Sequence, residues 1–398
     1  MADSDMHTLE QALAALLADV APLSTERVSL AMAAGRVLAE TLTAQLDTPP
    51  FDNSAMDGYA LRAADAGRVL PVSQRIMAGD AAAPLAANSC ARIFTGAPLP
   101  AGADSVVMQE QVESRDDGVY IPAPLAQGNS VRTRGREITC GETLIEAGTR
   151  LNSAALGFIA GQGIAEVAVT RRPRIALLST GDELKMPGET LAPGQIYNSN
   201  RFMLSDLLPR FGAELTRVEH VADTSQATRE ALARAAAETD VVVTTGGVSV
   251  GEADHVRDAL EQLGQLDLWR LSIRPGKPLA LGRIGDTRFV GLAGNPVSAF
   301  VGAWLFLRPL LGALQGAAAM SELPRISARA AFDTTTAARS HYMRVALTFE
   351  GGEYHAHAFA DQDSSILRSC VQADALAVIP ANSSVSVGDI VSCLRLEA

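Results

Sequence analysis

The spacing of apolar residues divides the chain into segments of different character. Over residues 8–20, leucine and valine recur at helical spacing, and Thr8 and Gln11 fit a capping box, which predicts an amphipathic helix. Residues 46–150 lack this period and contain many glycines, prolines and short β-branched runs, which predicts a small β-rich domain. The elements expected in and after it are strands at 92–95, 105–109 and 119–122, a helix at 153–162 and a strand at 164–169.

From residue 173 the pattern changes to alternating strands and helices. Compact apolar or β-branched runs predict strands at 175–179, 214–221, 240–245, 268–273 and 289–292. The runs between and after them predict helices at 200–210, 228–237, 254–263 and 297–314. Alternation of this kind predicts a doubly wound, mostly parallel α/β sheet.

Short strands return after residue 319, and they predict a small β-barrel or sandwich. They are expected at 326–331, 342–349, 375–379 and 390–396. A chain of 398 residues is too long for one ordinary core, so we predict a multi-domain α/β protein. Its four parts are a helical and extended N-terminal domain at 1–45 with 147–172, an inserted β-rich domain at 46–146, an α/β domain at 173–318 and a C-terminal small β-barrel at 319–398.

Charge and cysteine content narrow the class of protein. The 33 basic and 45 acidic residues leave a net charge of −12, which argues against nucleic acid or an anionic membrane as the main partner. An anionic substrate would therefore need a local group of arginines and lysines. No CxxC pair is present, so buried, reduced thiols in a cytoplasmic protein are expected. The four cysteines are Cys90, Cys140, Cys370 and Cys393.

Polar and charged residues follow each predicted strand of the α/β segment. Ligands of open α/β sheets bind beyond the carboxyl ends of the strands. The residues expected there are 179–183, 223–224, 244–254, 274–278 and 294–298. One sheet edge thus collects glycines, hydroxyls, carboxylates and cations, which predicts a binding site.

The ionisable residues at this edge suit two different ligands. Converging carboxylates suit Mg²⁺, which favours carboxylate, phosphate and water oxygens. The acids are Asp182, Glu183, Asp223 and Asp254. Arginine forks suit tetrahedral oxyanions, and the basic residues are Arg270, Arg274 and Lys277. The alternatives are helix caps and solvated faces.

Two glycines and the start of a predicted helix place backbone N–H groups at the same sheet edge. Gly246 and Gly247 follow a β-branched strand, where backbone N–H groups can cradle phosphate; an ordinary tight turn is the alternative. Asn295 and Pro296 precede a predicted helix, whose first N–H groups can face an anion or form a plain helix start. The pattern is neither a Walker A loop nor a GxGxxG fingerprint.

A second polar constellation lies in the β-rich region. Residues 51–60 combine two acids, an amide, a hydroxyl and a glycine without a helical or strand period, which predicts a functional loop. Residues 94–98 and 132–137 are similar, and the latter run adds three arginines. It is a candidate second anion site, with a solvated loop as the alternative.

Together these motifs resemble the molybdopterin molybdenumtransferases (molybdenum insertases), the bacterial relatives of the gephyrin E domain. The matching runs are FDNSAMDGYA (51–60), TGAP (95–98), STGDEL (179–184), TTGGVSVGEAD (244–254), RPGKP (274–278) and GNPVSA (294–299). They extend through nearly the whole chain with consistent spacing.

The resemblance implies an enzyme that inserts molybdenum from molybdate into adenylylated molybdopterin. Mg²⁺-dependent release of AMP would accompany the step and give molybdenum cofactor. The resemblance also implies a homodimer in which the α/β domain of one subunit faces the 51–60 loop of the other. A molybdopterin adenylyltransferase is the implied donor of the substrate.

The resemblance also implies roles for individual residues. The catalytic set is Asp57, Thr95, Glu183, Asp223 and Asp254, with Asp223 and Asp254 as Mg²⁺ ligands. The substrate-binding set is Arg132, Glu137, Gly246, Gly247, Ser249, Lys277, Asn295 and Pro296. The molybdate set is Arg270, Arg274, Arg344 and Ser364. Arginine stands at 270 and 274 where lysine is common, Glu137 where aspartate is common, and Ser365 makes the position of the hydroxyl ambiguous.

Two other functions remain open at this point. A pterin adenylyltransferase would resemble the α/β segment alone, so the regions 51–150 and 319–398 argue against it. A non-catalytic pterin-binding scaffold would not need to keep Asp57, Glu183, Asp223 and Asp254 together, and the presence of all four argues against it. No Ser-His-Asp arrangement is evident, so electrostatic catalysis rather than a side-chain nucleophile is expected.

Overall fold

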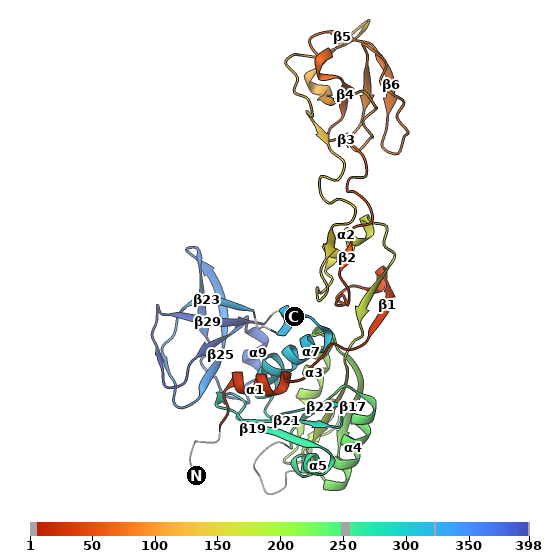
Figure 1. The fold of residues 1–398 in the computed structure, drawn as a ribbon. Coiled ribbons are helices and arrows are strands. Elements are labelled where there is room, and N and C mark those ends of the chain that lie inside the picture. Colours follow the sequence, from red (N-terminus) through yellow and green to blue (C-terminus); the bar gives the residue numbers. More distant parts are fainter. Residues whose placement is uncertain (1–5, 248–254, 322–323, 397–398) are drawn as a thin grey trace. The chain divides into compact units, whose positions relative to one another are not determined.

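The computed structural model describes residues 6–247, 255–321 and 324–396. They fold into two compact units, which are drawn in Figure 1. The main unit consists of Met1–Glu26, Gly35–Ala39 and Ala168–Ala398, and the insert unit consists of Arg27–Ala34 and Glu40–Val167. The finer division into four domains stays a prediction.

A six-stranded sheet forms the centre of the main unit. Its strands lie in the order β17 (Glu214–Val221), β14 (Arg174–Thr180), β18 (Val241–Thr245), β22 (Thr287–Leu292), β21 (Pro278–Ile284) and β19 (Gln265–Arg270). The first four are parallel, while β21 is antiparallel to both of its neighbours. Every residue of β18 and β22 is buried, as expected for apolar runs in the middle of a sheet covered on both faces.

The predicted strand at 268–273 is wrong in its extent. β19 ends at Arg270, and β20 (Ile273–Arg274) belongs to a different sheet. The sequence analysis also missed β21, which forms a hairpin with β22 across a turn where Gly285 has a φ of 59°. Short apolar runs do not indicate strand direction, so the pattern gives no sign of this antiparallel hairpin.

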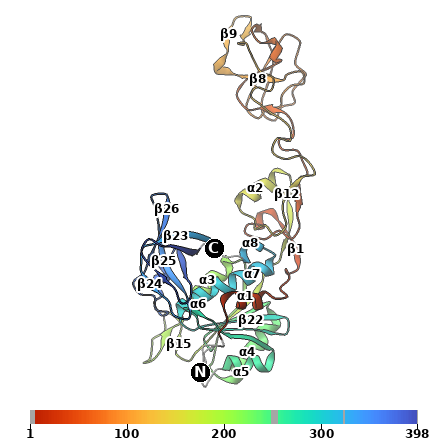
Figure 2. The same ribbon diagram turned by 60° about the vertical axis from the view of Figure 1, so that its left-hand side comes forward.

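Helices cover both faces of the sheet (Figures 1 and 2). They are α3 (Ser199–Arg210), α4 (Ser225–Glu238), α5 (His255–Leu263), α6 (Pro296–Gly302) and α7 (Arg308–Gln315). α4 and α5 pack on the face that carries Ala176 and Val242, whereas α3, α6 and α7 pack on the face of Ile175 and Val241. Successive strand residues thus enter opposite cores, and the doubly wound prediction is confirmed. Truncating the fully buried Phe289 would cost about 3–5 kcal/mol.

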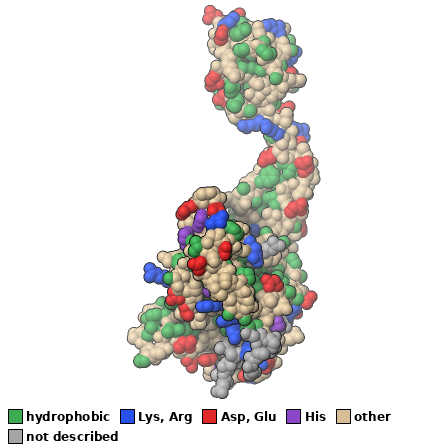
Figure 3. Space-filling model, turned by 90° about the vertical axis from the view of Figure 1, so that its left-hand side faces the viewer, with side chains coloured by type: hydrophobic (Ala, Val, Ile, Leu, Met, Phe, Trp, Pro, Cys, Tyr) green, Lys and Arg blue, Asp and Glu red, His purple; other side chains and the backbone are tan. Residues whose placement is uncertain are grey.

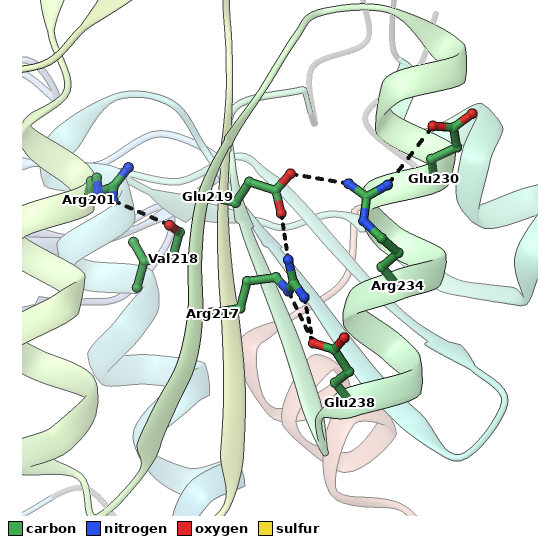
Figure 4. Close-up of polar contacts among 7 residues, drawn as sticks. All are labelled: Arg201, Arg217, Val218, Glu219, Glu230, Arg234 and Glu238. Carbon is green, nitrogen blue, oxygen red and sulfur yellow. Dashed lines mark hydrogen bonds and ion pairs between the residues drawn. The ribbon is translucent and has the colours of Figure 1, made fainter.

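Ion pairs attach α4 to the edge strand β17, as Figure 4 shows. The Arg217 guanidinium lies 2.7 Å from the Glu238 carboxylate and 3.2 Å from that of Glu219. Arg234 lies 3.2 Å from Glu219 and 4.0 Å from Glu230. These side chains are between about a quarter and a half exposed, so each pair contributes at most about 1 kcal/mol. Charges on an edge strand also disfavour pairing with another chain.

The predicted helix at 297–314 forms most of the run Pro296–Gln315. A π-helical stretch, Ala303–Leu307, joins α6 to α7 within it. Among the described residues, this run alone is long and apolar enough to span a membrane, and 89% of its most apolar window is buried. Trp304, Phe306 and Leu310 lie in the core beside α3. Its hydrophobicity is therefore that of a central core helix.

The N-terminal segment packs on this same core. α1 (Leu9–Leu17) begins with the predicted capping box, because the Thr8 hydroxyl accepts from the Gln11 backbone N–H and the Gln11 side chain accepts from that of Thr8. Leu9 and Leu16 are buried in the core of the α/β sheet. The helix is three residues shorter at its C-terminus than the apolar stripe suggests, because Ala18 leaves the helical region.

The C-terminal strands form a closed barrel rather than a sandwich. Its order is β25 (Ser340–Glu350), β26 (Glu353–Ala358), β23 (Arg325–Ala330), β29 (Ile390–Arg395) and β27 (Ala375–Ile379), with β27 pairing back to β25. The long β25 allows this closure, since its first half pairs with β27 and its second half with β26. Short elements beside the barrel are β24 (Thr334–Thr335), α9 (Arg368–Gln372) and β28 (Ser384–Val385), whereas α8 (Ala318–Ser321) packs against α7.

The insert unit is built from small sheets, as its short β-branched runs predict. One has the order β6 (Val72–Ile76), β7 (Cys90–Ile93), β4 (Gly58–Leu61) and β8 (Ser105–Met108), and a second has β5 (Val69–Leu70), β10 (Gly118–Tyr120) and β9 (Glu113–Arg115). The remaining elements, some of which reach the boundary with the main unit, are β1 (Thr25–Ser29), β2 (Leu42–Thr43), β3 (Asn53–Ser54), β11 (Val131–Arg132), β12 (Thr143–Ile145), α2 (Ser153–Gly161) and β13 (Glu166–Thr170).

The cysteines and surface charges bear on the earlier expectations. All four cysteines are free thiols, but only Cys90 and Cys393 are buried; Cys370 is partly buried and Cys140 is exposed, so the expectation of buried thiols is wrong for Cys140 and only partly met by Cys370. Cys140 lies in the turn before β12, where its backbone N–H donates to Asp47. Acidic and basic side chains are interspersed on the face drawn in Figure 3.

Candidate functional site

A cavity of about 710 Å³ opens at the carboxyl edge of the α/β sheet. Its walls come from the segments after β14, β18 and β22, from the turn before β21, and from the loop before α9. Seven of the residues predicted from sequence line it: Glu183, Gly246, Arg274, Lys277, Asn295, Pro296 and Ser364. The structure therefore brings together residues from four of the five predicted strand ends.

Other predicted residues of this half lie outside the lining. They are Asp223, Gly247, Arg270 and Arg344. Ser249 and Asp254 fall outside the described residues. The roles predicted for all these residues stay predictions.

Two glycines allow close packing beside the cavity. Gly246 has a φ of 86°, and a Cβ there would lie 2.8 Å from the Thr180 carbonyl oxygen. Its N–H donates to the Leu292 carbonyl oxygen at 3.2 Å, so this group is not available to cradle phosphate, contrary to the expectation. Gly181 has a φ of 134°, and a Cβ there would meet the Glu183 carboxylate at 2.4 Å. At both positions glycine therefore allows a close approach that a side chain would prevent.

Three cationic side chains line the cavity. Arg274, Lys277 and Arg339 have no ion pair with another described residue, and the first two are exposed. Arg274 reaches the cavity because β20 pairs with the start of β25, opposite His341. Arg339 was not predicted, since it belongs to the barrel region far along the chain from the loops of the sheet. Unpaired arginine and lysine side chains in a cavity form an anion site.

Arg344 is fully buried instead of facing the cavity. Its guanidinium donates to Ser369 Oγ at 2.9 Å and to the carbonyl oxygens of Gln362 and Asp363 at 3.1 and 3.0 Å. Burial lowers the pKa of this guanidinium below its ordinary value. Arg344 thus fixes the loop that carries Ser364.

The two neighbouring serines of this loop differ in their hydrogen bonds. Ser365 donates from Oγ to the Asp363 carboxylate at 2.7 Å. Ser364 Oγ instead accepts from the Asn295 side-chain amide at 3.0 Å, so its own hydroxyl hydrogen is left for a ligand. Hydrogen bonds from Ser365 lower the pKa of Asp363, which keeps this carboxylate ionised beside the cations. The geometry therefore favours Ser364 over Ser365 as the donor to an anion.

Two asparagines of the cavity wall were not predicted. Asn198 and Asn200 are 3% and 7% exposed and line the cavity at the start of α3. Asn198 Nδ2 and Asn200 Oδ1 have no hydrogen-bond partner within the described parts of the chain. Buried amide groups are normally satisfied by protein, water or a ligand. The signal in the sequence was weak, because asparagine before a helix is usually only an N-cap, a role that Asn198 also fulfils.

The acids at the sheet edge come from neighbouring strands. The Asp223 backbone N–H lies 3.4 Å from Asp182 Oδ1, which places the ends of β14 and β17 side by side. Among the described residues no group of three or more His, Cys, Asp and Glu side chains is placed to hold a metal ion. One or two carboxylates plus substrate oxygens are sufficient for Mg²⁺, so Asp182 and Asp223 are chemically suited to this ion, although neither lines the cavity.

The second constellation lies in the insert unit. Asp57 Oδ1 accepts from both the backbone N–H and the hydroxyl of Thr95, each at 2.8 Å. These hydrogen bonds lower the pKa of Asp57, and the charge of Arg92 adds to the effect. The structure thus brings Asp57 and Thr95 together. Thr95 holds the Asp57 carboxylate in one orientation and favours its ionised form.

The arginine-rich run forms a separate hollow in this unit. Arg132 and Glu137, which were predicted to bind substrate, line an open hollow of about 320 Å³ with Pro49 and Arg136. Arg134 points instead to Asp47, with which it forms an ion pair. Only two of the three arginines expected to form an anion site, Arg132 and Arg136, therefore line this hollow.

Comparison with known proteins places this geometry in a family. A model of the MoeA N-terminal region (domain I and II) matches residues 7–163, a probable molybdopterin binding domain matches 176–313, and the MoeA C-terminal region (domain IV) matches 327–396. The molybdopterin molybdenumtransferase of Haemophilus influenzae is 36% identical over 395 residues, which cover 97% of this chain and 98% of the relative. The chain belongs to the molybdopterin molybdenumtransferase family.

Further relatives agree with this assignment. The molybdopterin molybdenumtransferase of a Nostoc species is 36% identical over 94% of this chain and 89% of its own length. The solved structure of a molybdopterin biosynthesis MoeA protein from Pyrococcus horikosii is 30% identical, with a TM-score of 0.82 over 99% of this chain and all of that one. The predicted resemblance, the multi-domain α/β fold with a C-terminal barrel, and the assignment as an enzyme of molybdenum cofactor biosynthesis are confirmed.

Proposed function

We propose that this chain inserts molybdenum from molybdate into adenylylated molybdopterin, with release of AMP. The observation that carries the proposal is the cavity itself, where Arg274, Lys277 and Arg339 face open space without ion-pair partners among the described residues. In a chain with a net charge of −12, such a cationic cavity is suited to anionic substrates. Both proposed substrates, molybdate and the pterin with its phosphates, are anions.

The residues divide the work between the two substrates. Arg274 and Lys277 hold the tetrahedral molybdate by charge, and the Ser364 hydroxyl donates one oriented hydrogen bond to it. Asn198 and Asn200 also line the cavity, where their unpartnered amide atoms can meet polar groups of the pterin. The cations also stabilise negative charge that develops as the phosphoanhydride bond of the adenylylated substrate is cleaved.

Asp223 would hold Mg²⁺ with Asp182 and, as the resemblance implies, with Asp254 from outside the described residues. When bound, Mg²⁺ supplies charge neutralisation and polarisation at the phosphate oxygens. Glu183 packs against Gly181 and lines the cavity, where its carboxylate can orient a substrate hydroxyl or water.

The insert unit would complete the site in a homodimer. Asp57 and Thr95, with Arg132 and Glu137, would approach the cavity of the partner subunit, so that each active site contains both subunits. A cytoplasmic location and a molybdopterin adenylyltransferase as substrate donor belong to the same proposal.

The deciding experiment measures AMP release from adenylylated molybdopterin, with and without molybdate and Mg²⁺. Release that requires both supports insertion. Formation of adenylylated pterin from ATP would instead identify an adenylyltransferase, and tight pterin binding without turnover would identify a scaffold.

A mixing experiment tests the shared site. Asp57→Asn and Asp223→Asn subunits are each expected to be inactive as homodimers. After subunit exchange, a heterodimer has one site with both changes and one with neither, so about a quarter of all sites regain activity. If activity does not return although heterodimers form, the site is not shared.

A further inference from the structure

Asp57 and Thr95 lie at the paired ends of two antiparallel strands. β4 begins directly after Asp57, and β7 ends just before Phe94. In the register of this pair, Gly58 lies opposite Ile93 and Tyr59 lies opposite Arg92. Any group that fixes the two strand ends against each other therefore also fixes the Asp57–Thr95 hydrogen bonds.

Arg92 contacts both of these strand ends. Its Nη1 donates to the Gly58 carbonyl oxygen at 3.0 Å, and its Nη2 donates to the Gln109 side chain after β8. The guanidinium carbon also lies 5.1 Å from the ring centre of Tyr59 and 4.7 Å from that of Phe94. The guanidinium is thus held by neighbours on both sides of the Asp57–Thr95 pair.

We infer that Arg92 is a positioning residue, which orients the Asp57 carboxylate through its hydrogen bond to the Gly58 carbonyl oxygen and its contact with the Phe94 ring. The importance of this orientation for turnover rests on the proposed function. Arginine suits the position because its flat guanidinium lies against aromatic rings while two of its nitrogens donate in fixed directions, whereas a lysine ammonium has no flat face and cannot reproduce the forked donation to Gly58 and Gln109.

Arg75 offers a matched control. Its guanidinium carbon lies 4.8 Å from the ring centre of the same Phe94, so it shares the aromatic contact. No hydrogen bond from Arg75 to Gly58 or Gln109 is present among the described residues. Arg75→Lys and Arg92→Lys keep the same net charge, and they differ in whether the hydrogen bonds to the strand ends are lost.

The first test is spectroscopic and independent of activity. Met56 precedes Asp57 and is 44% exposed, so its methyl resonance, recorded in the full chain after labelling of methionine methyl groups, reports the local conformation. Arg92→Lys is expected to shift or broaden this resonance, and Arg75→Lys to leave it in place. Equal spectra for Arg92→Lys and the wild type would overturn the inference.

The second test uses AMP release and chemical rescue. Arg92→Ala is expected to lower kcat by about 10- to 100-fold with little change in KM, since the carboxylate is misplaced rather than removed. Added guanidinium should restore a several-fold part of this loss in Arg92→Ala, whereas the same concentration of sodium chloride should not. Rescue by both salts alike, or an equal loss of kcat in Arg75→Ala, would contradict a positioning role. If the wild type releases no AMP, the proposed function fails, while the Met56 spectrum still decides the position of Arg92.

Discussion

The charged side chains of the cavity in the main unit and of the Asp57 loop in the insert unit differ in whether they already have partners. In the cavity, Arg274, Lys277 and Arg339 have no ion-pair partner in the described parts of the chain. In the loop, Asp57 already accepts two hydrogen bonds from Thr95. Unpaired charges are available to bind a ligand, whereas a carboxylate with satisfied hydrogen bonds is held in one place. The first region is therefore built for binding and the second for orientation.

The largest expected effect is on the acids at the sheet edge. Asp223→Asn should lower the rate of AMP release by about 10²–10³-fold and abolish its response to added Mg²⁺, because a charge that stabilises the transition state is lost. Glu219→Gln, in the ion-pair network on β17, the strand that precedes Asp223, is the control and should keep nearly the full rate. Comparable losses in the two variants would show that the effect is structural.

Removing one cation of the cavity should weaken the binding of molybdate. Arg274→Ala is expected to raise the KM for molybdate by about 10- to 100-fold, as loss of a hydrogen bond between charged groups predicts. Arg325→Ala removes the same charge from the barrel outside the cavity and should leave KM unchanged. A salt titration of the wild type adds a check, since added salt should weaken molybdate binding. An unchanged KM in Arg274→Ala would exclude it from the molybdate site.

A buried histidine beneath these cations should make the main unit sensitive to acid. Burial, helped by the charges of Arg274, Arg344 and Arg339, lowers the pKa of His341 from 6.5 to about 4. The unfolded chain binds this proton first, so stability is present above pH 6.5 and is lost as the pH falls towards about 4. The loss is about 1.4 kcal/mol by pH 5.5.

Urea unfolding measures this loss, because both tryptophans, Trp269 and Trp304, belong to the main unit and report its unfolding by fluorescence. His341→Gln should flatten the dependence of the unfolding free energy on pH between pH 6.5 and about 4. His220→Gln, at an exposed position, should behave like the wild type. The same slope in all three proteins would contradict the role of His341.

The smallest effect is expected at the preformed carboxylate. Thr95→Val removes the hydroxyl donor to Asp57 and leaves the backbone N–H, so the lowered pKa of Asp57 should rise toward its ordinary value. The acid limb of kcat/KM should move to higher pH, with a several-fold loss at most near neutrality, where the carboxylate stays ionised. Thr41→Val removes a similar hydrogen bond, to Glu146, and should not move the limb.

Local patterns predicted the elements well where a single signal dominates. The capping box at Thr8 fixed the start of α1, and β17 has the predicted limits of 214–221. The run at 268–273 failed because its two halves pair in different sheets, β19 and β20. Strand direction and sheet membership depend on partners distant in sequence, which no local period records.

The residues of the candidate site also divide into those that the local sequence predicted and those that depend on tertiary contacts. The sheet-edge rule placed Glu183, Lys277 and Asn295 around one cavity. It gave no sign of Arg339, because that residue reaches the cavity only through the pairing of β20 with β25. The resemblance placed Arg344 with molybdate, whereas in the structure the side chain is buried and orders the loop of Ser364.

By itself, the sequence determined the family, the doubly wound sheet and the collection of charged residues at one edge, because motif spacing and apolar periodicity are local properties of the chain. Only the tertiary structure decided which of those charges remain unpaired, which serine has a hydroxyl hydrogen to donate, and that Arg92 contacts both strand ends beside Asp57. These outcomes depend on hydrogen bonds and burial between residues far apart in the chain.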